Sequence, residues 1–335
     1  MRLRVQRSFE DGAWRGPFAR LLERQWASRA RARRRLIVPP GLRVIGVGGA
    51  TLGGSGKTPL VLALARCAPA GLRVAVLARS YPRRIRSPQL VRETALPVLV
   101  GDEAVMLARH LAGTSIAVWV GERQRVLDQL SSAYDFAIID GLLQAEPEPL
   151  HCAVLSLDAS SPWGSGRCPP AGDLVACPQE LLSASDIVVV KQRPGLASDL
   201  HAFGEGVVSH AWSHGIVGAQ SLETRRRLPV SELARLRLGL ILALGRPRRV
   251  IAELAGLGIF PKVMLLRPDH AHFPQGRNRS GEALDAWLTT AKCATKLENS
   301  YRGAPVWVLE QGGRLPAAVV SRCFGRGSLE GGQAW

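Results

Sequence analysis

One glycine-rich segment, residues 47–59, constrains the fold of this 335-residue chain more than any other feature. A mainly apolar run at residues 42–47 leads into it, and an apolar helical pattern at residues 60–65 follows it. Strand, glycine-rich turn and helix in this order make a phosphate-binding loop, because the amides of the turn and the positive end of the helix meet at one anion site. The segment therefore predicts a nucleotide-binding α/β protein, and a glycine-rich turn without nucleotide is the alternative.

The residues of this loop have separate expected roles. Glycines such as Gly54 and Gly56 let the backbone approach a phosphate closely. Lys57 is expected to reach the outer phosphates, and the hydroxyl of Thr58 is expected to ligate magnesium. The general pattern asks for glycine where this chain has Thr51. The expected cofactor-binding residues are Thr51, Gly53, Gly54, Ser55, Gly56, Lys57 and Thr58.

The chain is strongly basic, with a formal net charge of +17. Residues 1–36 alone hold eleven arginines against three acidic residues. This excess indicates an anionic partner, which can be nucleic acid, phospholipid head groups or a phosphorylated substrate. The six cysteines form no CxxC pair, which favours reduced thiols in the cytosol. Neither a membrane-spanning helix nor a secretory signal is expected, because no apolar run is long enough and the N-terminus is too charged.

Residues 13–30 show a helical pattern with apolar side chains on one side and arginine elsewhere. The apolar side carries Trp14, Phe18, Leu21, Leu22 and Trp26. A basic helix with such a face is typical of a peripheral anchor on an anionic membrane surface. The alternative is a helix that packs on its own domain beside a solvated basic tail. Nucleic acid is not the expected partner, because aromatic residues that could stack on bases do not continue beyond this helix.

Short β-like runs alternate with helical stretches after residue 40, which predicts a P-loop NTPase-like parallel sheet flanked by helices. The expected strands are residues 43–47, 73–78, 116–120, 136–139, 153–157 and 187–190. The pattern restarts near residue 238 and predicts a smaller α/β unit. Its expected strands are residues 238–244, 262–266 and 305–309, and its expected helices are residues 248–257 and 281–288. The expected division is a basic amphipathic segment 1–38 that associates with a membrane, a P-loop core 39–225, a smaller α/β domain 226–325 and a tail 326–335.

Two acidic positions follow apolar runs. Asp140 ends an expected strand, and a carboxylate at such a position in a phosphate-loop protein holds magnesium or its water, with a turn-capping aspartate as the alternative. Asp102 and Glu103 open an expected helix at residues 104–110. They are either ordinary first-turn acids, or one of them is a general base near the nucleotide. Spacing alone does not show whether Asp102 or Glu103 would be that base.

Asp269 and His270 follow a strand of the second unit, and His272 comes two residues later. An aspartate beside a histidine can supply a proton acceptor or orient one, whereas a lone histidine is usually a surface or core residue. Metal binding by the two histidines is not expected, because the sequence offers no further ligands for them.

In this order the motifs resemble the tetraacyldisaccharide 4'-kinase family, the lipid A 4'-kinases of Gram-negative bacteria. The loop of that family reads V-G-N-x-T-x-G-G-T-G-K-T-P, and this chain follows it with Gly49 for Asn and Ser55 for Thr while keeping Thr51. The other matching segments are VGDE at residues 100–103, VGER at 120–123, DA at 158–159, PWGSGR at 162–167, PAGDL at 170–174 and the pair Asp269-His270. The segments around Trp163 are far more specific than a phosphate loop alone.

The resemblance implies a peripheral enzyme at the cytoplasmic face of the inner membrane. Such an enzyme transfers the γ-phosphate of ATP, with Mg²⁺, to the 4'-hydroxyl of a tetraacylated glucosamine disaccharide 1-phosphate. The resemblance implies that Asp102 is the base that receives the hydroxyl proton and that His270 is its partner. Lys57 and Thr58 hold the phosphates and magnesium in this scheme, with Asp140 on the metal side. The implied partners are the lipid disaccharide and an anionic membrane surface, and no protein partner is implied.

Several positions depart from the family pattern. The family usually has paired aspartates before Gly141, where this chain has Ile139-Asp140, and the family's glutamine falls one place later, at Gln144. The family segments S-R-G-Y-G and T-E-K-D read ARSYP at residues 78–82 and TAKC at residues 290–293. Loss of a carboxylate near magnesium weakens transition-state stabilisation. One alternative is therefore a catalytically weakened member that binds nucleotide and membrane without efficient transfer. Another is a phosphate-loop enzyme with a different phosphorylated or nucleic-acid partner, against which the Trp163 motif argues.

Overall fold

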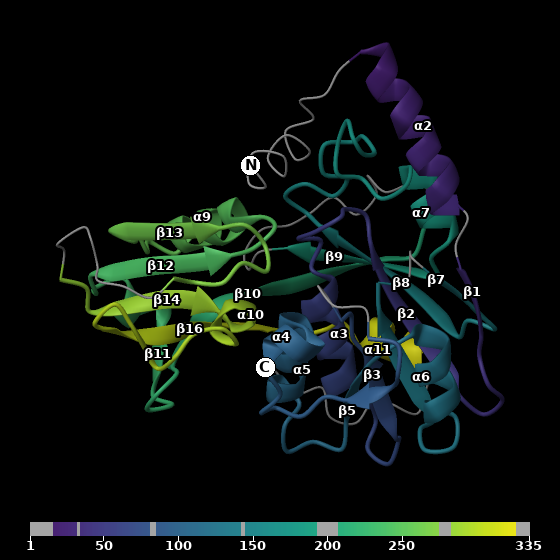
Figure 1. Ribbon diagram of the computed structural model, residues 1–335, viewed down its shortest axis with the longest axis horizontal. Coiled ribbons are helices and arrows are strands. Elements are labelled where there is room, and N and C mark those ends of the chain that lie inside the picture. Colours follow the sequence, from purple (N-terminus) through teal and green to yellow (C-terminus); the bar gives the residue numbers. More distant parts are fainter. Residues whose placement is uncertain are drawn as a thin grey trace. The chain divides into compact units, whose positions relative to one another are not determined.

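The chain forms two compact units (Figure 1). The computed structural model describes residues 16–31, 34–80, 85–141, 145–192, 207–274 and 283–325. The first unit holds the described residues up to Ser213 together with those from Arg314 onward, and the second unit is His214–Gly313. The chain therefore leaves the first unit, builds the second and returns to the first.

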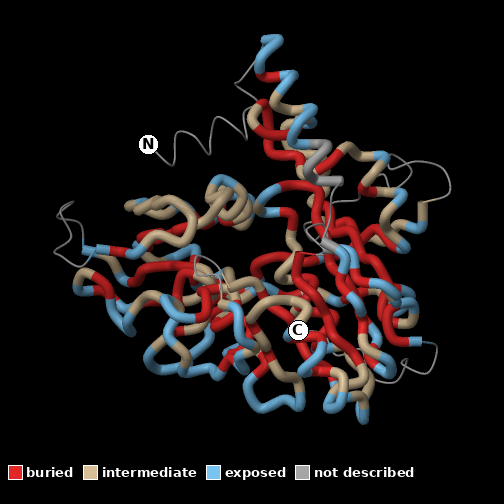
Figure 2. The backbone as a smooth tube through the Cα atoms, turned by 45° about the vertical axis from the view of Figure 1, so that its right-hand side comes forward, coloured by how far each residue is buried: buried red, intermediate tan, exposed pale blue. Residues whose placement is uncertain are grey.

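The first unit is built on a mostly parallel sheet with the strand order β10-β9-β8-β2-β6-β3-β5-β4. Among its described strands, only β4 runs antiparallel to its neighbour. The strands are β2 (Arg43–Gly49), β3 (Val74–Leu77), β4 (Gln89–Leu90), β5 (Ala117–Val120), β6 (Phe136–Asp140), β8 (Cys152–Asp158), β9 (Ile187–Gln192) and the start of β10 (Ser209–Ser221). The strands β2, β3 and β6 are buried along nearly their whole length, in line with the red segments of Figure 2. Strands buried on both faces form continuous apolar runs rather than alternating ones.

Helices flank this sheet (Figure 1). They are α3 (Lys57–Arg66), α4 (Pro97–Val100), α5 (Asp102–His110), α6 (Arg123–Leu130), α7 (Pro178–Ser183) and α11 (Ala317–Phe324). The helix α6, for example, buries Val126, Leu127 and Leu130 in a core cluster that also holds Ala75 and Ile139 of the sheet. The first unit also contains α2 (Pro17–Arg31) and a small parallel pair, β1 (Arg34–Ile37) with β7 (Ala145–Glu148).

The last described helix, α11, packs against strands of the first unit. The rings of Phe324 and Phe136 meet edge to face with their centroids 5.2 Å apart. The sulfur atoms of Cys323 and Cys152 are 3.9 Å apart. All four side chains are buried, so the C-terminal part of the chain closes part of the core that the earlier strands begin.

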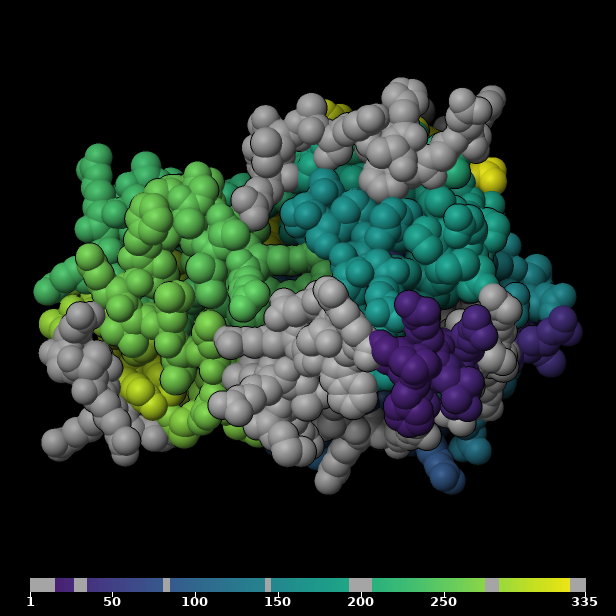
Figure 3. Space-filling model, turned by 90° about the horizontal axis from the view of Figure 1, so that it is seen from above, coloured from purple at the N-terminus to yellow at the C-terminus, as the bar shows by residue number. Residues whose placement is uncertain are grey.

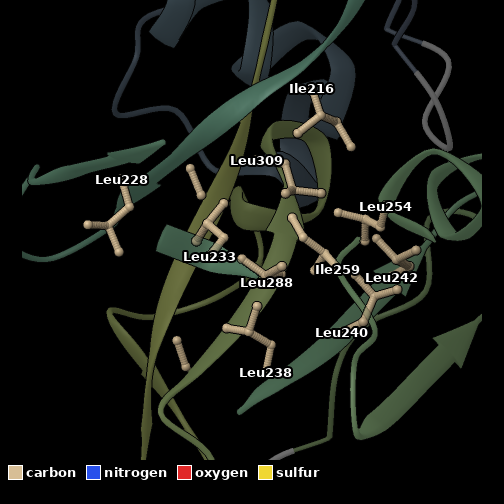
Figure 4. Packing of buried hydrophobic residues seen from close by; sticks show 12 residues of the cluster. Ile216, Leu228, Leu233, Leu238, Leu240, Leu242, Leu254, Ile259, Leu288 and Leu309 are labelled. Atoms are coloured by element: carbon tan, nitrogen blue, oxygen red, sulfur yellow. The ribbon is translucent and has the colours of Figure 1, made fainter. Parts of the chain in front are cut away.

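In the second unit the strands follow the order β13-β12-β14-β16-β10. Its elements are β11 (Arg227–Pro229), α8 (Val230–Leu233), β12 (Leu238–Ala243), α9 (Pro247–Gly256), β13 (Val263–Arg267), β14 (Ala286–Thr290), α10 (Ala291–Ala294), β15 (Ser300–Tyr301) and β16 (Ala304–Gly313). A cluster of leucine and isoleucine side chains, including Leu240, Leu254 and Leu288, packs α9 against the strands (Figure 4). The strand β10 belongs to both units, since Ser209 to Ser213 pair with β9 and later residues pair with β16.

The structure confirms the predicted alternation of strands and helices. The helix predicted at residues 281–288 is wrong in its described part, because β14 occupies Ala286–Thr290. Ala286, Trp287 and Leu288 are buried between β12 and β16, and a strand buried on both faces lacks the alternation that marks a strand in sequence. The sequence pattern predicts neither β10 nor α11.

Candidate active site

The glycine-rich loop lies at the carboxyl ends of three neighbouring strands. Val47 of β2 pairs with Asp140 of β6 and Val154 of β8, and Gly49 pairs with Ser156. In an open parallel sheet this edge binds ligands, because loops there join strand ends to helix N-termini. The register therefore places the loop and Asp140 side by side at the binding edge.

The loop passes into helix α3 at Lys57. Gly54 and Gly56 have φ angles of 73° and 80°. These values lie in the left-handed region, which glycine adopts without a steric penalty, so the turn requires glycine at both positions. Leu60 and Leu64 are fully buried and anchor α3 on the sheet. The N-terminal end of an anchored helix then presents free amides and the positive end of its dipole to the loop.

Lys57 folds back over the loop. Its Nζ lies 3.1 Å from Oγ of Ser55 and 3.4 Å from the carbonyl oxygen of Thr51. Ser156 at the end of β8 is fully buried, and its Oγ donates a hydrogen bond of 2.7 Å to the carbonyl oxygen of Ser55. The loop is thus closed around its lysine, whose contacts with loop oxygens can be exchanged for phosphate oxygens.

Thr51 occupies the position where the general pattern has glycine, and its side chain points into the loop. The residue is 1% exposed, and its Oγ1 donates to the carbonyl oxygen of Gly53 at 2.8 Å. The next residue, Leu52, donates its backbone N–H to the carbonyl oxygen of Asp173 at 2.9 Å. The hydroxyl of Thr51 therefore fixes the turn internally, and the backbone beside it ties the loop to the segment that follows Trp163.

Asp140 is a buried carboxylate beside the start of α3. It is 2% exposed, and its Oδ2 accepts a hydrogen bond from Oγ1 of Thr58 at 2.8 Å. Within the described residues, its Oδ1 accepts no hydrogen bond. Burial raises the pKa of Asp140, and the nearby carboxylate of Glu103 raises it further. Lys57, the Thr58 hydrogen bond and Arg79 oppose this rise.

These groups fit magnesium. A carboxylate, a threonine hydroxyl and the phosphate oxygens of a nucleotide are the hard oxygen ligands that Mg²⁺ takes in phosphate-loop proteins. The unpaired buried oxygen of Asp140 is suited to a cation. Across the described parts of the chain, no group of three or more His, Cys, Asp or Glu side chains could hold a metal alone. A magnesium ion at Asp140 would therefore depend on the nucleotide for several of its ligands.

Two arginines place positive charge near the end of β6. The Nη2 of Arg123 donates to the carbonyl oxygens of Asp140 at 3.3 Å and Gly141 at 3.0 Å. Burial lowers the pKa of Arg123 to about 10, Arg79 lowers it as well, and Asp140 acts in the opposite direction. Two neighbouring guanidinium groups that are partly withdrawn from water favour an anion such as phosphate. The sequence motifs assign no role to Arg79, Arg123 or Ser156, although the first two lie in family-like segments.

Asp102 and Glu103 form the first turn of α5. Asp102 is 4% exposed, and its Oδ1 accepts the backbone N–H of Glu103 at 3.0 Å. The carboxylate of Glu103 is near enough to Asp140 to raise its pKa. The structure therefore brings the predicted loop residues, Asp140 and Glu103 together in the first unit, with Asp102 next to Glu103 in the same turn.

The Trp163 motif forms a turn held by Asp173. Its Oδ1 accepts both the N–H of Ser165 at 2.9 Å and the Oγ of Ser165 at 3.1 Å. Glu23 of α2 makes an ion pair of 2.8 Å with Arg167 and accepts the N–H of Cys168 at 2.9 Å. The helix α2, purple in Figure 3, is thus joined to the first unit through this motif.

The helix α2 leaves part of its predicted apolar side in solvent. Phe18 is 67% exposed and Leu21 is 53% exposed. Trp26 is less exposed, and its Nε1 donates to the carbonyl oxygen of Val175 at 3.2 Å. Trp14 lies outside the described residues. None of the described helices combines the length and apolarity needed to cross a bilayer.

His270 belongs to the second unit and follows β13. Its Nε2 lies 3.4 Å from Oδ2 of Asp269, and its side chain is 19% exposed. Lys292 on α10 lies 2.9 Å from the other carboxylate oxygen of Asp269. His272 is exposed, whereas His270 contacts the Asp269–Lys292 ion pair.

A closed glycine-rich loop over a lysine, with a helix threonine bonded to an aspartate of the adjacent strand, is the arrangement of a P-loop phosphotransferase. Comparison of the chain with known protein families identifies the family within that class. The family model described as tetraacyldisaccharide-1-P 4'-kinase matches residues 16–324, and the chain belongs to this family. This confirms the family that the motifs predict.

Relatives and a solved structure agree with this assignment. The tetraacyldisaccharide 4'-kinase of Chromobacterium violaceum is 32% identical over 92% of this chain and 93% of its own length. That of Acidithiobacillus ferrooxidans is 30% identical over 82% of each chain. The crystal structure of the "apo" form of LpxK from Aquifex aeolicus in complex with ATP superimposes with a TM-score of 0.70 at 23% identity. The superposition covers 92% of this chain and 98% of the Aquifex aeolicus chain, which establishes that the two share a fold.

Proposed function

We propose that this protein transfers the γ-phosphate of ATP to the 4'-hydroxyl of tetraacyldisaccharide 1-phosphate during lipid A biosynthesis. The family assignment and the names of the relatives support this activity and do not favour a member that only binds nucleotide. The structural observation that supports it most is the 2.8 Å hydrogen bond between Thr58 and Asp140 beside the closed loop. That bond joins the phosphate-binding side of the site to its metal-binding side.

In the proposed reaction, the loop amides and Lys57 bind the phosphates of ATP, and Thr58 with Asp140 holds Mg²⁺. The ion, when bound, neutralises part of the phosphate charge. Arg123 and Arg79 add positive charge at the same edge. These residues align the phosphate and stabilise the charge that moves during transfer.

Asp102 is the proposed base. It accepts the proton of the 4'-hydroxyl while the hydroxyl oxygen forms a bond to the γ-phosphorus. The bond between that phosphorus and the oxygen bridging it to the β-phosphorus breaks, and ADP leaves. His270 is the proposed partner of this base, held by Asp269. Since Asp102 is buried at the start of a helix, its position is fixed before substrate arrives.

An assay of the purified chain tests this proposal. With ATP, Mg²⁺ and tetraacyldisaccharide 1-phosphate, mass spectrometry should detect a 4'-phosphorylated product. Asp102→Asn should lower kcat by about a hundredfold or more, because it removes the proton acceptor. The exposed helix residue Asp128 provides the matched control, and Asp128→Asn should retain full activity. ATP binding without product would instead support the weakened member that binds nucleotide only.

We further propose that the protein acts at the cytoplasmic face of the inner membrane of a Gram-negative bacterium, with α2 on the anionic surface. The exposed Phe18 and Leu21, beside the exposed Arg20 and Arg24, support this placement. The double variant Phe18→Ser, Leu21→Ser should bind phosphatidylglycerol vesicles at least about tenfold more weakly. Ile37→Ser is the control, because Ile37 is an exposed apolar residue on β1. Salt-sensitive DNA binding without vesicle binding would contradict the proposal.

A further inference from the structure

An ion-paired cluster lies at the carboxyl ends of strands in the second unit. Asp269 follows β13, and Lys292 lies on α10 directly after β14. The strands β13 and β14 both run parallel to β12, which separates them in the sheet. The Nζ of Lys292 lies 2.9 Å from Oδ1 of Asp269, and its side chain is only 12% exposed against 32% for Asp269. The better-buried partner of the pair is therefore the lysine.

Asp269 contacts His270 through both of its carboxylate oxygens. Its Oδ1 accepts the backbone N–H of His270 at 3.0 Å, and its Oδ2 lies 3.4 Å from the ring Nε2. His270 has a φ of 62°, a left-handed conformation that residues with a side chain rarely adopt. A left-handed backbone conformation persists where neighbouring groups stabilise it. The hydrogen bond from the N–H of His270 to the carboxylate of Asp269 is one such stabilising contact.

Short-range structure fixes the backbone that carries Lys292. Thr290 caps α10 by accepting the N–H of Cys293 at 3.5 Å. The sulfur of Cys293 in turn accepts the N–H of Ala243 at 3.2 Å. The helix that bears Lys292 is thereby fastened to the ends of β14 and β12. A largely buried ammonium group on a fixed backbone can hold a carboxylate in one orientation.

We propose that Lys292 is a positioning residue for phosphate transfer, acting through Asp269 on His270. The inference rests on the proposed function, in which His270 assists the base. Lys292 fixes one oxygen of Asp269, and this leaves the other oxygen facing the imidazole. Lys292 itself does not need to touch ATP or the disaccharide.

Steady-state kinetics of three variants test the role. Lys292→Met keeps much of the stem but removes the charge, and it should lower kcat about tenfold or more while KM for ATP changes less than about twofold. Lys292→Arg should recover most of the lost kcat, since it restores a cation. Lys262→Met is the control. Lys262 is an exposed residue directly before β13, at the opposite end of that strand from Asp269, so this variant should leave both constants unchanged. A wild-type kcat for Lys292→Met would overturn the proposal.

A double-mutant cycle tests whether Lys292 acts through the histidine. In the background of His270→Ala, adding Lys292→Met should cause little further loss of kcat. Losses that multiply fully would show that Lys292 acts by another route and would overturn the proposal.

A spectroscopic measurement separates this proposal from the proposed function. The imidazole signals of the full chain, labelled with ¹³C-histidine, can be assigned to His270 through His270→Ala. Lys292→Met should shift the His270 signals, and Lys262→Met should not. If the wild type transfers no phosphate but these shifts occur, the proposed activity fails, while the finding that Lys292 positions His270 through Asp269 stands. Unchanged His270 signals in Lys292→Met would overturn the positioning role.

Discussion

Folding and metal binding place conflicting requirements on the carboxylate of Asp140. Its carboxylate is 2% exposed, and both burial and the neighbouring Glu103 disfavour the charged form. The same negative charge is what a magnesium ion requires. We therefore expect Asp140 to reduce the stability of the protein while serving its chemistry.

The variant Asp140→Asn tests this conflict. An amide has the same shape, can still accept the hydrogen bond from Thr58 and carries no charge to bury. The free energy of unfolding should rise by about 1 kcal/mol, and phosphate transfer should fall by about a hundredfold or more. Differential scanning calorimetry and the kinase assay measure the two effects. A lower Tm would show that the carboxylate stabilises the fold.

The sequence predicts the parts of the site that depend on local geometry. Gly54 and Gly56 are identifiable because the turn needs a backbone that only glycine provides readily. Thr51 is identifiable as a family mark, but its inward hydrogen bond is visible only in the structure. Ser156 and Arg123 could not be predicted, because Ser156 reaches the loop through the pairing of β8 with β2 and Arg123 reaches the end of β6 from the start of α6.

At the scale of elements, one turn fastens the amino ends of three strands. The backbone of Asp135, just before β6, donates to the carbonyl oxygen of Arg73 at 2.8 Å and accepts the N–H of Arg43 at 3.0 Å. Its carboxylate accepts the backbone N–H of Arg73 at 2.8 Å and makes an ion pair of 2.8 Å with the guanidinium group. This single aspartate links β6 with β2 and with the start of β3.

These contacts predict a pH dependence of stability. Hydrogen bonds from Arg73 lower the pKa of Asp135 from 3.8 to about 2. A carboxylate whose pKa is lower in the folded state stabilises it fully above the unfolded pKa and loses that effect as pH falls through the folded pKa. Asp135→Asn should therefore lower Tm by a few degrees at pH 7, and its difference from wild type should shrink between about pH 4 and pH 2. A difference that stays constant over that range would contradict the assignment.

Most elements are predictable because strands buried on both faces give short apolar runs between turns. A continuous apolar run can also be mistaken for a helix. The apolar residues Ala283, Leu284, Trp287 and Leu288 fit a helical spacing, which is why the sequence predicts a helix where the structure has β14. The strand β10 escapes prediction because residues 209–221 mix histidine, serine and glycine with apolar residues. Its pairing partners, β9 and β16, define it as a strand.

At the scale of the whole molecule, sequence order and spatial grouping differ. The helix α11 is the last described element, and it belongs to the first unit. Linear periodicity cannot show this, because the return depends on contacts with β6 and β8 that are distant in sequence. The predicted division at residues 38, 225 and 325 stays a prediction.

Truncation of one ring in α11 should destabilise the first unit selectively. Phe324→Ala removes a buried ring that packs on Phe136, and the cost should be about 3 kcal/mol. Hydrogen exchange should become faster in β6 and β8 and should stay unchanged in β12 and β14. Arg322→Ala is the control, because it removes only an exposed ion pair with Asp186. Faster exchange confined to the second unit would contradict the grouping.

The two ends of the second unit are hydrogen-bonded neighbours. His214 of β10 pairs with Gly313 of β16 in an antiparallel ladder, so the chain enters and leaves this unit through adjacent strands. A unit whose two ends lie side by side can be inserted into a host chain at a single point, because the entering and leaving strands are neighbours. The polypeptide thus consists of a host unit that carries the phosphate loop and an inserted unit that carries the Lys292 cluster.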